Sequence, residues 1–140
     1  MATYHSTRSR TAQLSAKEAI RRGIAPDGGL YVSDELGDRQ IDLAGIASKS
    51  YFELAREVLG MLLSDYTDEE IAACVEEAYG TTFASDEVTP LVKLEGAGAD
   101  GADAADTVPS YVLELWHGPT SAFKDVALQM LPRLMARTTS

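Results

Sequence analysis

The last part of the sequence, residues 107–140, limits the possible folds more than any other stretch. Tyr111–Trp116 (YVLELW) is rich in strand-forming residues, residues 117–125 (HGPTSAFKD) are a polar turn, and about Phe123–Ala136 has the apolar spacing of a helix. A strand, a turn and a helix are the first half of a β-α-β unit, and no second strand follows before Ser140. We therefore expect an α/β protein, α+β within this chain alone, and we expect the chain to be the front end of a larger one.

The predicted last helix carries an apolar stripe that needs a partner surface. Because the helix follows a strand, we expect this stripe to lie on a sheet. Pro132 lies inside the helix, where a proline costs about 3 kcal/mol and usually produces a kink. The residues of the stripe and its flank are Phe123, Ala127, Leu131, Leu134, Val126 and Met130.

Residues 1–94 predict a small helical domain with short strands. Two helix starts have the Ser-x-x-Glu pattern of a capping box, at Ser15 and Ser50, and Thr67 opens a third helix whose first turn has three acidic residues, which suit the positive helix end. Such a box satisfies two backbone N–H groups that have no partner within the helix. Glycine is favoured just past a helix end, so Gly23 and Gly80 predict where the first and third of these helices stop.

Short extended segments surround these helices. Pro26–Gly29 (PDGG) predicts a turn, because proline presets φ and glycine accepts positive φ, and Leu30–Val32 then predicts a strand. Thr89–Leu94 predicts an edge strand, since Pro90 cannot donate to a ladder. Residues 95–106 (EGAGADGADAAD) have no large apolar side chain, so they predict a flexible acidic loop.

The charge balance excludes several kinds of partner. The net charge of −10 would repel the phosphates of nucleic acids and of anionic membranes. The single cysteine, Cys74, excludes an intrachain disulfide and fits a reducing compartment. The first 25 residues have no apolar core of a signal peptide, and no apolar run approaches the roughly 20 residues of a membrane span. We expect a cytoplasmic protein that binds neither nucleic acid nor membrane.

The polar turn holds several side chains capable of chemistry. His117 follows the strand, and a single histidine is more often a structural hydrogen-bonding group than a catalyst. It does not predict a metal site, because the only other histidine is His5 and no cluster has ligand spacing. The hydroxyl of Thr120 or Ser121 can cap the helix that follows.

Lys124 has two interpretations. A lysine in the first turn lies at the positive end of the helix, which disfavours an ammonium group. It can be a solvent-exposed side chain whose charge Asp125 offsets. Alternatively, the helix end and burial favour its neutral amine, which is a nucleophile that forms a Schiff base with a carbonyl, most commonly that of pyridoxal phosphate.

A resemblance to a known family favours the second interpretation. HGPTSAFKD resembles the pyridoxal-lysine motif of the threonine synthases, H-G-P-T-x-A-F-K-D, at every fixed position. YHSTRSR resembles the Y-x-S-T-R-G opening of that family, APDGGLYV resembles its DGGLYVP segment, and SYFELAREVL resembles its S-Y-x-x-L-A helix. The order and spacing also agree over nearly the whole chain. The chain departs from the pattern at Ser9, Ser33 and Pro132.

The resemblance implies a fold-type II pyridoxal-phosphate enzyme that converts O-phospho-L-homoserine and water to L-threonine and phosphate. It implies that Lys124 is the catalytic lysine that binds the cofactor, with Phe123 and Asp125 as further cofactor-binding residues and His117, Thr120 and Ser121 in supporting roles. It divides the chain into an N-terminal domain (1–94), the acidic loop (95–106) and the start of the catalytic domain (107–140). The remainder of that domain would supply the groups for the cofactor's phosphate and ring nitrogen, so this chain alone is expected to be inactive.

Two other functions remain open. The chain could be a binding or assembly module in which the motif is only a capped turn. It could also belong to another pyridoxal lyase of the same fold, such as a threonine dehydratase or cysteine synthase relative. APDGGLYV and HGPT argue against the second alternative, because those relatives are not expected to carry them.

Overall fold

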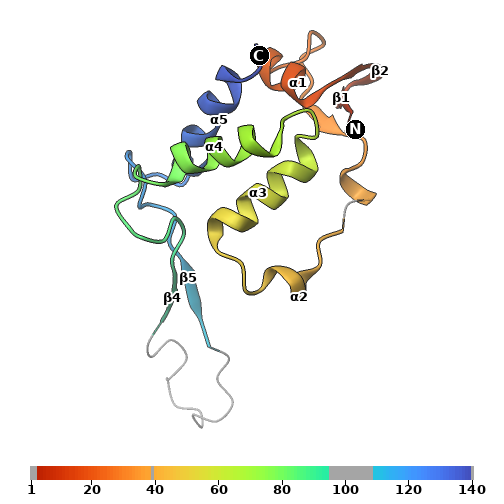
Figure 1. The fold of residues 1–140 in the computed structure, drawn as a ribbon. Helices are drawn as coiled ribbons and strands as arrows, with labels where there is room; N and C mark the ends of the chain where they lie inside the picture. Colours follow the sequence, from red (N-terminus) through yellow and green to blue (C-terminus); the bar gives the residue numbers. More distant parts are fainter. Residues whose placement is uncertain (1–2, 39, 95–108, 140) are drawn as a thin grey trace.

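The computed structural model describes residues 3–38, 40–94 and 109–139. Its helices and small sheets confirm the expected mixture of α and β structure (Figure 1). A three-stranded sheet and the helices form one body, from which a two-stranded ribbon projects (Figure 1). The acidic loop predicted at 95–106 lies outside the described residues.

The N-terminal sheet has the order β2-β1-β3, with β1 (Tyr4–Ser6), β2 (Ser9–Leu14) and β3 (Tyr31–Ser33) all antiparallel. The sequence predicts β3 but neither of the first two strands. The predicted turn before β3 is present, and its Gly28 has the positive φ expected of a glycine there, 75°. In that turn the Asp27 carboxylate accepts a hydrogen bond of 2.9 Å from the Gly29 N–H, which fixes the entry into β3.

The two central helices begin where Ser50 and Thr67 predict. Before α3 (Tyr51–Leu62), the Ser50 hydroxyl accepts from the Glu53 N–H, and the Glu53 carboxylate accepts from the Ser50 N–H. Before α4 (Asp68–Tyr79), Thr67 and Glu70 form the same two bonds. Gly80 caps the C-terminus of α4 as predicted. These reciprocal bonds explain why local sequence alone sets both helix starts.

The first helix, α1 (Ala16–Arg22), forms only half of its predicted box. Ser15 Oγ accepts from the Glu18 N–H at 3.3 Å, while the Glu18 carboxylate forms an ion pair with Arg22 one turn later. Gly23 ends the helix with a positive φ of 72°, as predicted. Two short elements have no counterpart in the prediction, the 3-10 turn η1 (Leu36–Asp38) and α2 (Leu43–Ile46).

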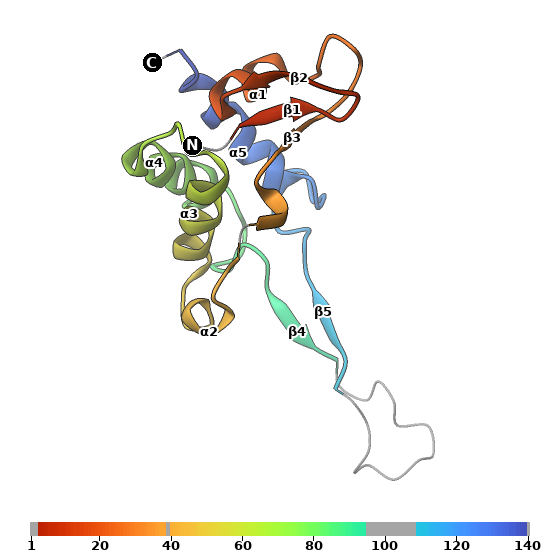
Figure 2. The same cartoon turned by 90° about the vertical axis from the view of Figure 1, so that its right-hand side faces the viewer.

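Helix α4 forms the centre of the core, and α5 (Asp125–Ala136) packs against it (Figure 2). The apolar stripe predicted for α5 is only partly buried. Its buried residues are Asp125, Met130 and Leu134, while Phe123, Ala127 and Leu131 of the predicted stripe are exposed. The buried face of the helix lies against α4 and α1, and the sheet expected beneath the rest of the stripe stays a prediction. Pro132 is exposed within α5, which continues through it to Ala136. The fully buried residues of α4 include Ile71, Cys74, Val75 and Ala78.

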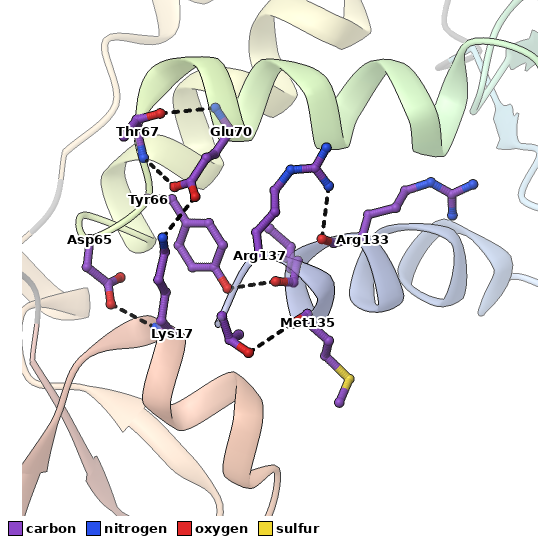
Figure 3. A network of polar contacts seen from close by, with 10 residues as sticks. Lys17, Asp65, Tyr66, Thr67, Glu70, Arg133, Met135 and Arg137 are labelled. Atoms are coloured by element: carbon purple, nitrogen blue, oxygen red, sulfur yellow. Dashed lines mark hydrogen bonds and ion pairs between the residues drawn. The ribbon is translucent and has the colours of Figure 1, made fainter. Parts of the chain in front are cut away.

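A polar network holds α1, α4 and α5 together (Figure 3). Lys17 of α1 donates through its backbone N–H to Asp65 and through Nζ to Glu70, both at 2.9 Å. Its ammonium also lies 4.9 Å from the centre of the Tyr66 ring, a cation–π distance. The Tyr66 hydroxyl donates to the Leu134 carbonyl at 3.1 Å. These contacts fix the C-terminal half of α5 against the body.

The projecting ribbon pairs β4 (Leu91–Lys93) with β5 (Tyr111–Leu113) in an antiparallel ladder. This confirms the predicted edge strand. It corrects the bounds of the strand predicted over Tyr111–Trp116, which ends at Leu113 and has β4 as an antiparallel neighbour. Within the described ranges, no helix is both long enough and apolar enough to cross a membrane.

Candidate active site

The turn between β5 and α5 is organised around a buried carboxylate. Asp125 has no exposed surface. Its Oδ2 accepts from the Thr120 backbone N–H at 2.8 Å, and its Oδ1 accepts from the Thr120 hydroxyl at 2.8 Å. The Ala122 N–H makes a longer contact of 3.5 Å with Oδ2. The first residue of α5 therefore reaches back and closes the loop that precedes it.

Two backbone features allow this closure. A Cβ atom on Gly118 would lie 2.4 Å from the Asp125 Cβ and 2.6 Å from Oδ2, so only glycine fits this approach. Ser121 has a φ of 55°, in the left-handed region that is uncommon for a residue other than glycine. The Ser121 N–H donates to the Gly118 carbonyl at 3.0 Å, which tightens the turn around this strained residue.

The hydrogen bonds set the charge state of Asp125. Burial alone would raise the pKa of this carboxyl, because it disfavours the charged form. The hydroxyl and N–H of Thr120, the N–H of Ala122 and the Lys124 charge oppose it, and together they hold the pKa of Asp125 below its ordinary value of 3.8. Asp125 is therefore an anion at neutral pH, and its charge is directed into the turn.

Lys124 occupies the N-cap position of α5. Its carbonyl accepts from the Ala127 N–H at 3.0 Å and the Leu128 N–H at 2.8 Å, so its backbone is part of the helix start. Its side chain is exposed and forms no hydrogen bond or ion pair with any residue that the structure describes. The burial expected of a reactive lysine is thus not found in this part of the chain. Phe123, beside it, is 74% exposed.

His117 has a partner that the sequence analysis missed. Its Nε2 lies 2.6 Å from Glu114 Oε2, and its ring stacks on Trp116 at 5.7 Å between centroids. Its carbonyl accepts from the Ala84 N–H at 2.9 Å, which ties the turn to the segment after α4. An acid three residues before the histidine was the available signal. No group of histidine, cysteine and acidic residues suited to a metal is found among the residues described.

The structure thus brings some predicted site residues together and separates others. Thr120 and Asp125 are joined by two hydrogen bonds, but neither Thr120 nor Ser121 caps α5, whose start has no side-chain cap. His117 pairs with Glu114 instead of joining this cluster. A cleft of about 570 Å³ lies between α1, β3 and the far end of α5, and no predicted site residue lines it.

Comparison with known proteins decides the family. The family model described as "Threonine synthase N terminus" matches residues 3–79. The chain belongs to the threonine synthase family. A threonine synthase of Pseudomonas aeruginosa is 38% identical over 134 residues, which cover 94% of this chain and 26% of that protein. One of Schizosaccharomyces pombe is 38% identical over 137 residues, covering 94% of this chain and 24% of that protein.

Solved structures of the threonine synthase family have the same fold. A pyridoxal-phosphate-bound threonine synthase of Brucella melitensis superposes with a TM-score of 0.80 at 37% identity, over 99% of this chain and 27% of that one. Yeast threonine synthase superposes with a TM-score of 0.78 at 36% identity, over 94% of this chain and 25% of that one. The chain spans about a quarter of the length of the relatives it matches.

Two of the threonine synthase segments quoted above lie against each other in the N-terminal sheet. Ser6 Oγ donates to Asp27 Oδ1 at 2.7 Å, and the Leu30 N–H donates to Thr7 Oγ1 at 3.1 Å. A Cβ atom on Gly29 would lie 2.1 Å from Ser6 Oγ and 3.0 Å from Thr7 Oγ1, so the packing of the S-T-R segment leaves room only for glycine at position 29. The departures at Ser9 and Ser33 fall at the start of β2 and the end of β3.

Proposed function

We propose that this chain is the N-terminal portion of a threonine synthase that converts O-phospho-L-homoserine and water to L-threonine and phosphate, and that Lys124 is its cofactor lysine. The observation that carries the proposal is the match of residues 117–125 to the pyridoxal-lysine motif, in a chain that belongs to the threonine synthase family and whose Lys124 stands on a backbone fixed by α5 and the closed turn. Lysine carries the primary amine that a Schiff base with a carbonyl requires, and the Lys124 side chain is exposed, so a carbonyl compound can reach it. The Brucella melitensis threonine synthase structure contains bound pyridoxal phosphate, which supports the same cofactor here.

The described residues fit such a cofactor at one point only. Lys124 would attach it covalently, and Phe123 is exposed beside it and could contact its ring. Pyridoxal phosphate, when bound, supplies an electron sink for the charge that develops on the substrate carbon next to the amine. The Lys124 amine would move protons at the substrate carbons. His117, Thr120 and Ser121 would support the turn that carries it.

We further propose the division into an N-terminal domain (1–94), a connecting loop (95–106) and the start of the catalytic domain (107–140). The remainder of the catalytic domain would be the partner that holds the cofactor's phosphate and ring nitrogen, because residues 125–140 contain no glycine-rich loop for a phosphate. We place the protein in the cytoplasm, which the single buried, unpaired Cys74 supports.

An assay of phosphate release tests this function. The complete gene product, supplied with pyridoxal phosphate, is expected to release phosphate from O-phospho-L-homoserine, and the Lys124→Ala variant is expected to release almost none. The 140-residue chain alone is expected to stay at the level of a protein-free blank. Absence of release by the complete gene product would favour a binding or assembly module, and undiminished release by Lys124→Ala would remove Lys124 from the reaction.

A further inference from the structure

We infer that Asp125 is a positioning residue for Lys124 and does not itself contact the cofactor. The inference rests on the proposed function, and it differs from what the motif alone suggests for an acid next to the cofactor lysine. The observation behind it is that the Asp125 carboxylate is wholly buried and that both of its oxygens accept hydrogen bonds from Thr120, in the turn that precedes Lys124.

The direction of the carboxylate argues against a contact with a bound molecule. Adjacent residues at a helix start point in different directions, and here the Lys124 side chain is exposed while that of Asp125 has no exposed surface. Both Asp125 oxygens already accept hydrogen bonds from Thr120, one from its N–H and one from its hydroxyl. A cofactor group could reach them only if the turn opened.

The same bonds fix where the lysine stands. The loop from Thr120 to Lys124 contains Ser121, whose backbone is in the left-handed region. This conformation is strained and needs surrounding contacts to hold it. Asp125, just after the loop, supplies those contacts. Gly118, just before the loop, is buried against the Asp125 side chain and has no Cβ atom that would displace it. The Lys124 backbone lies between Asp125 and Ser121, so the carboxylate determines the point from which the amine is presented.

Positioning matters because covalent chemistry depends on geometry. A misplacement of about 1 Å at a reacting group can lower a rate by about 100-fold. Loss of the carboxylate should therefore slow attachment of the cofactor to Lys124 and lower kcat, while leaving the KM for substrate nearly unchanged. A residue that bound the cofactor by its charge would behave differently when only the charge is removed.

The test compares two substitutions at Asp125 in the complete gene product. Asp125→Ala removes both acceptors. Asp125→Asn keeps the shape, and its amide can accept from the Thr120 N–H and donate to the Thr120 hydroxyl. We expect Asp125→Ala to slow borohydride-trapped attachment of pyridoxal phosphate to Lys124 by about 10- to 100-fold. We expect Asp125→Asn to stay within about threefold of the unaltered protein, since the bonds and not the charge do the positioning.

A second pair covers the case in which Asp125→Ala does not fold. Thr120→Val removes only the exposed hydroxyl that donates to Asp125, and Thr120→Ser restores it. Thr120→Val should slow attachment and lower kcat, and Thr120→Ser should rescue both. Thr81→Val, at another exposed threonine, is the matched control and should change neither.

The outcomes separate this inference from the proposed function. If the unaltered protein attaches no cofactor at Lys124, the proposed function fails and the inference fails with it. If the unaltered protein does attach it, equal rates in Asp125→Ala or Thr120→Val, with only a lower melting temperature, overturn the inference alone. A loss in Asp125→Asn as deep as in Asp125→Ala, with the fold retained, would also overturn it, because that result indicates a charge contact with the cofactor.

Discussion

Replacement of Gly118 by alanine should destabilise the protein, although alanine usually stabilises a site where glycine is not required. The new Cβ would lie 2.4 Å from the Asp125 Cβ, and carbon atoms are in good contact at about 3.5–4.0 Å. The two must therefore separate by about 1 Å or more. Asp125 cannot move freely, because it begins α5 and its carboxylate is bonded to Thr120 at both oxygens.

The expected cost follows from two opposing effects. Overpacking of this kind costs about 1–3 kcal/mol. The loss of backbone freedom in the unfolded chain returns about 0.4–1 kcal/mol. We therefore expect Gly118→Ala to lower the free energy of unfolding by about 1–2 kcal/mol.

Gly37 provides a matched control. A Cβ atom at this glycine of η1 has no neighbour within 4 Å, and its φ is not positive. Gly37→Ala should therefore leave stability unchanged or raise it by up to about 1 kcal/mol, which is the opposite sign. Urea unfolding followed by far-UV circular dichroism measures both changes. A Gly118→Ala variant as stable as Gly37→Ala would refute the close approach of Gly118 and Asp125.

Three further predictions concern the core and the titratable groups. Ile71→Ala, at a side chain 2% exposed, should lower the free energy of unfolding in urea by about 2–5 kcal/mol, while Ile24→Ala, at 67% exposed, should change it by less than about 0.5 kcal/mol. The pKa of Asp125 in the folded protein is below 3.8, so its ionised form stabilises the fold above pH 3.8, and this contribution is lost as the pH falls through the folded pKa. The melting temperature of Asp125→Asn should therefore decline less steeply below about pH 4 than that of the unaltered protein. Cys74 is fully buried and burial raises the pKa of its thiol, so it should react with a thiol reagent at pH 8 only as the protein unfolds, and rapid labelling of the folded protein would contradict its placement.

The parts of the fold that the sequence predicts are those set by local chemistry. The starts of α3 and α4 follow from Ser50 and Thr67, whose capping bonds reach only three residues along the chain. The positive φ of Gly23 and Gly28 has the same local origin. The strand β2 was missed because four of its consecutive residues are exposed and polar or small, so no apolar alternation marks it. The strand β1 has only three residues, Tyr4–Ser6, which is too short for a period of two to be recognised.

The contacts at the C-terminal end involve distant residues and were not predicted. Met130 and Leu134 of α5 pack on α4, and the Tyr66 hydroxyl donates to the Leu134 carbonyl. Nothing in the spacing of apolar residues distinguishes a helical partner from a sheet. The antiparallel pairing of β5 with β4 is likewise a long-range choice.

The candidate site could be predicted in its residues but not in its geometry. The motif identifies Lys124 and its neighbours, and the resemblance to the threonine synthases gives them roles. The inward direction of Asp125 and the His117–Glu114 pair depend on how the turn closes. From the sequence, Asp125 is simply a charge next to Lys124; in the structure it belongs with Thr120 and Gly118.

The identity of the lysine that binds the cofactor tests the central claim most directly. The complete gene product is incubated with pyridoxal phosphate, reduced with borohydride, digested and examined by mass spectrometry. The modification should lie on Lys124, and Lys124→Ala and Lys124→Arg should abolish it while leaving the far-UV circular dichroism unchanged, because arginine has no primary amine and the side chain is exposed. Covalent attachment to another lysine in the unaltered protein, or persisting attachment in Lys124→Ala, would contradict the claim.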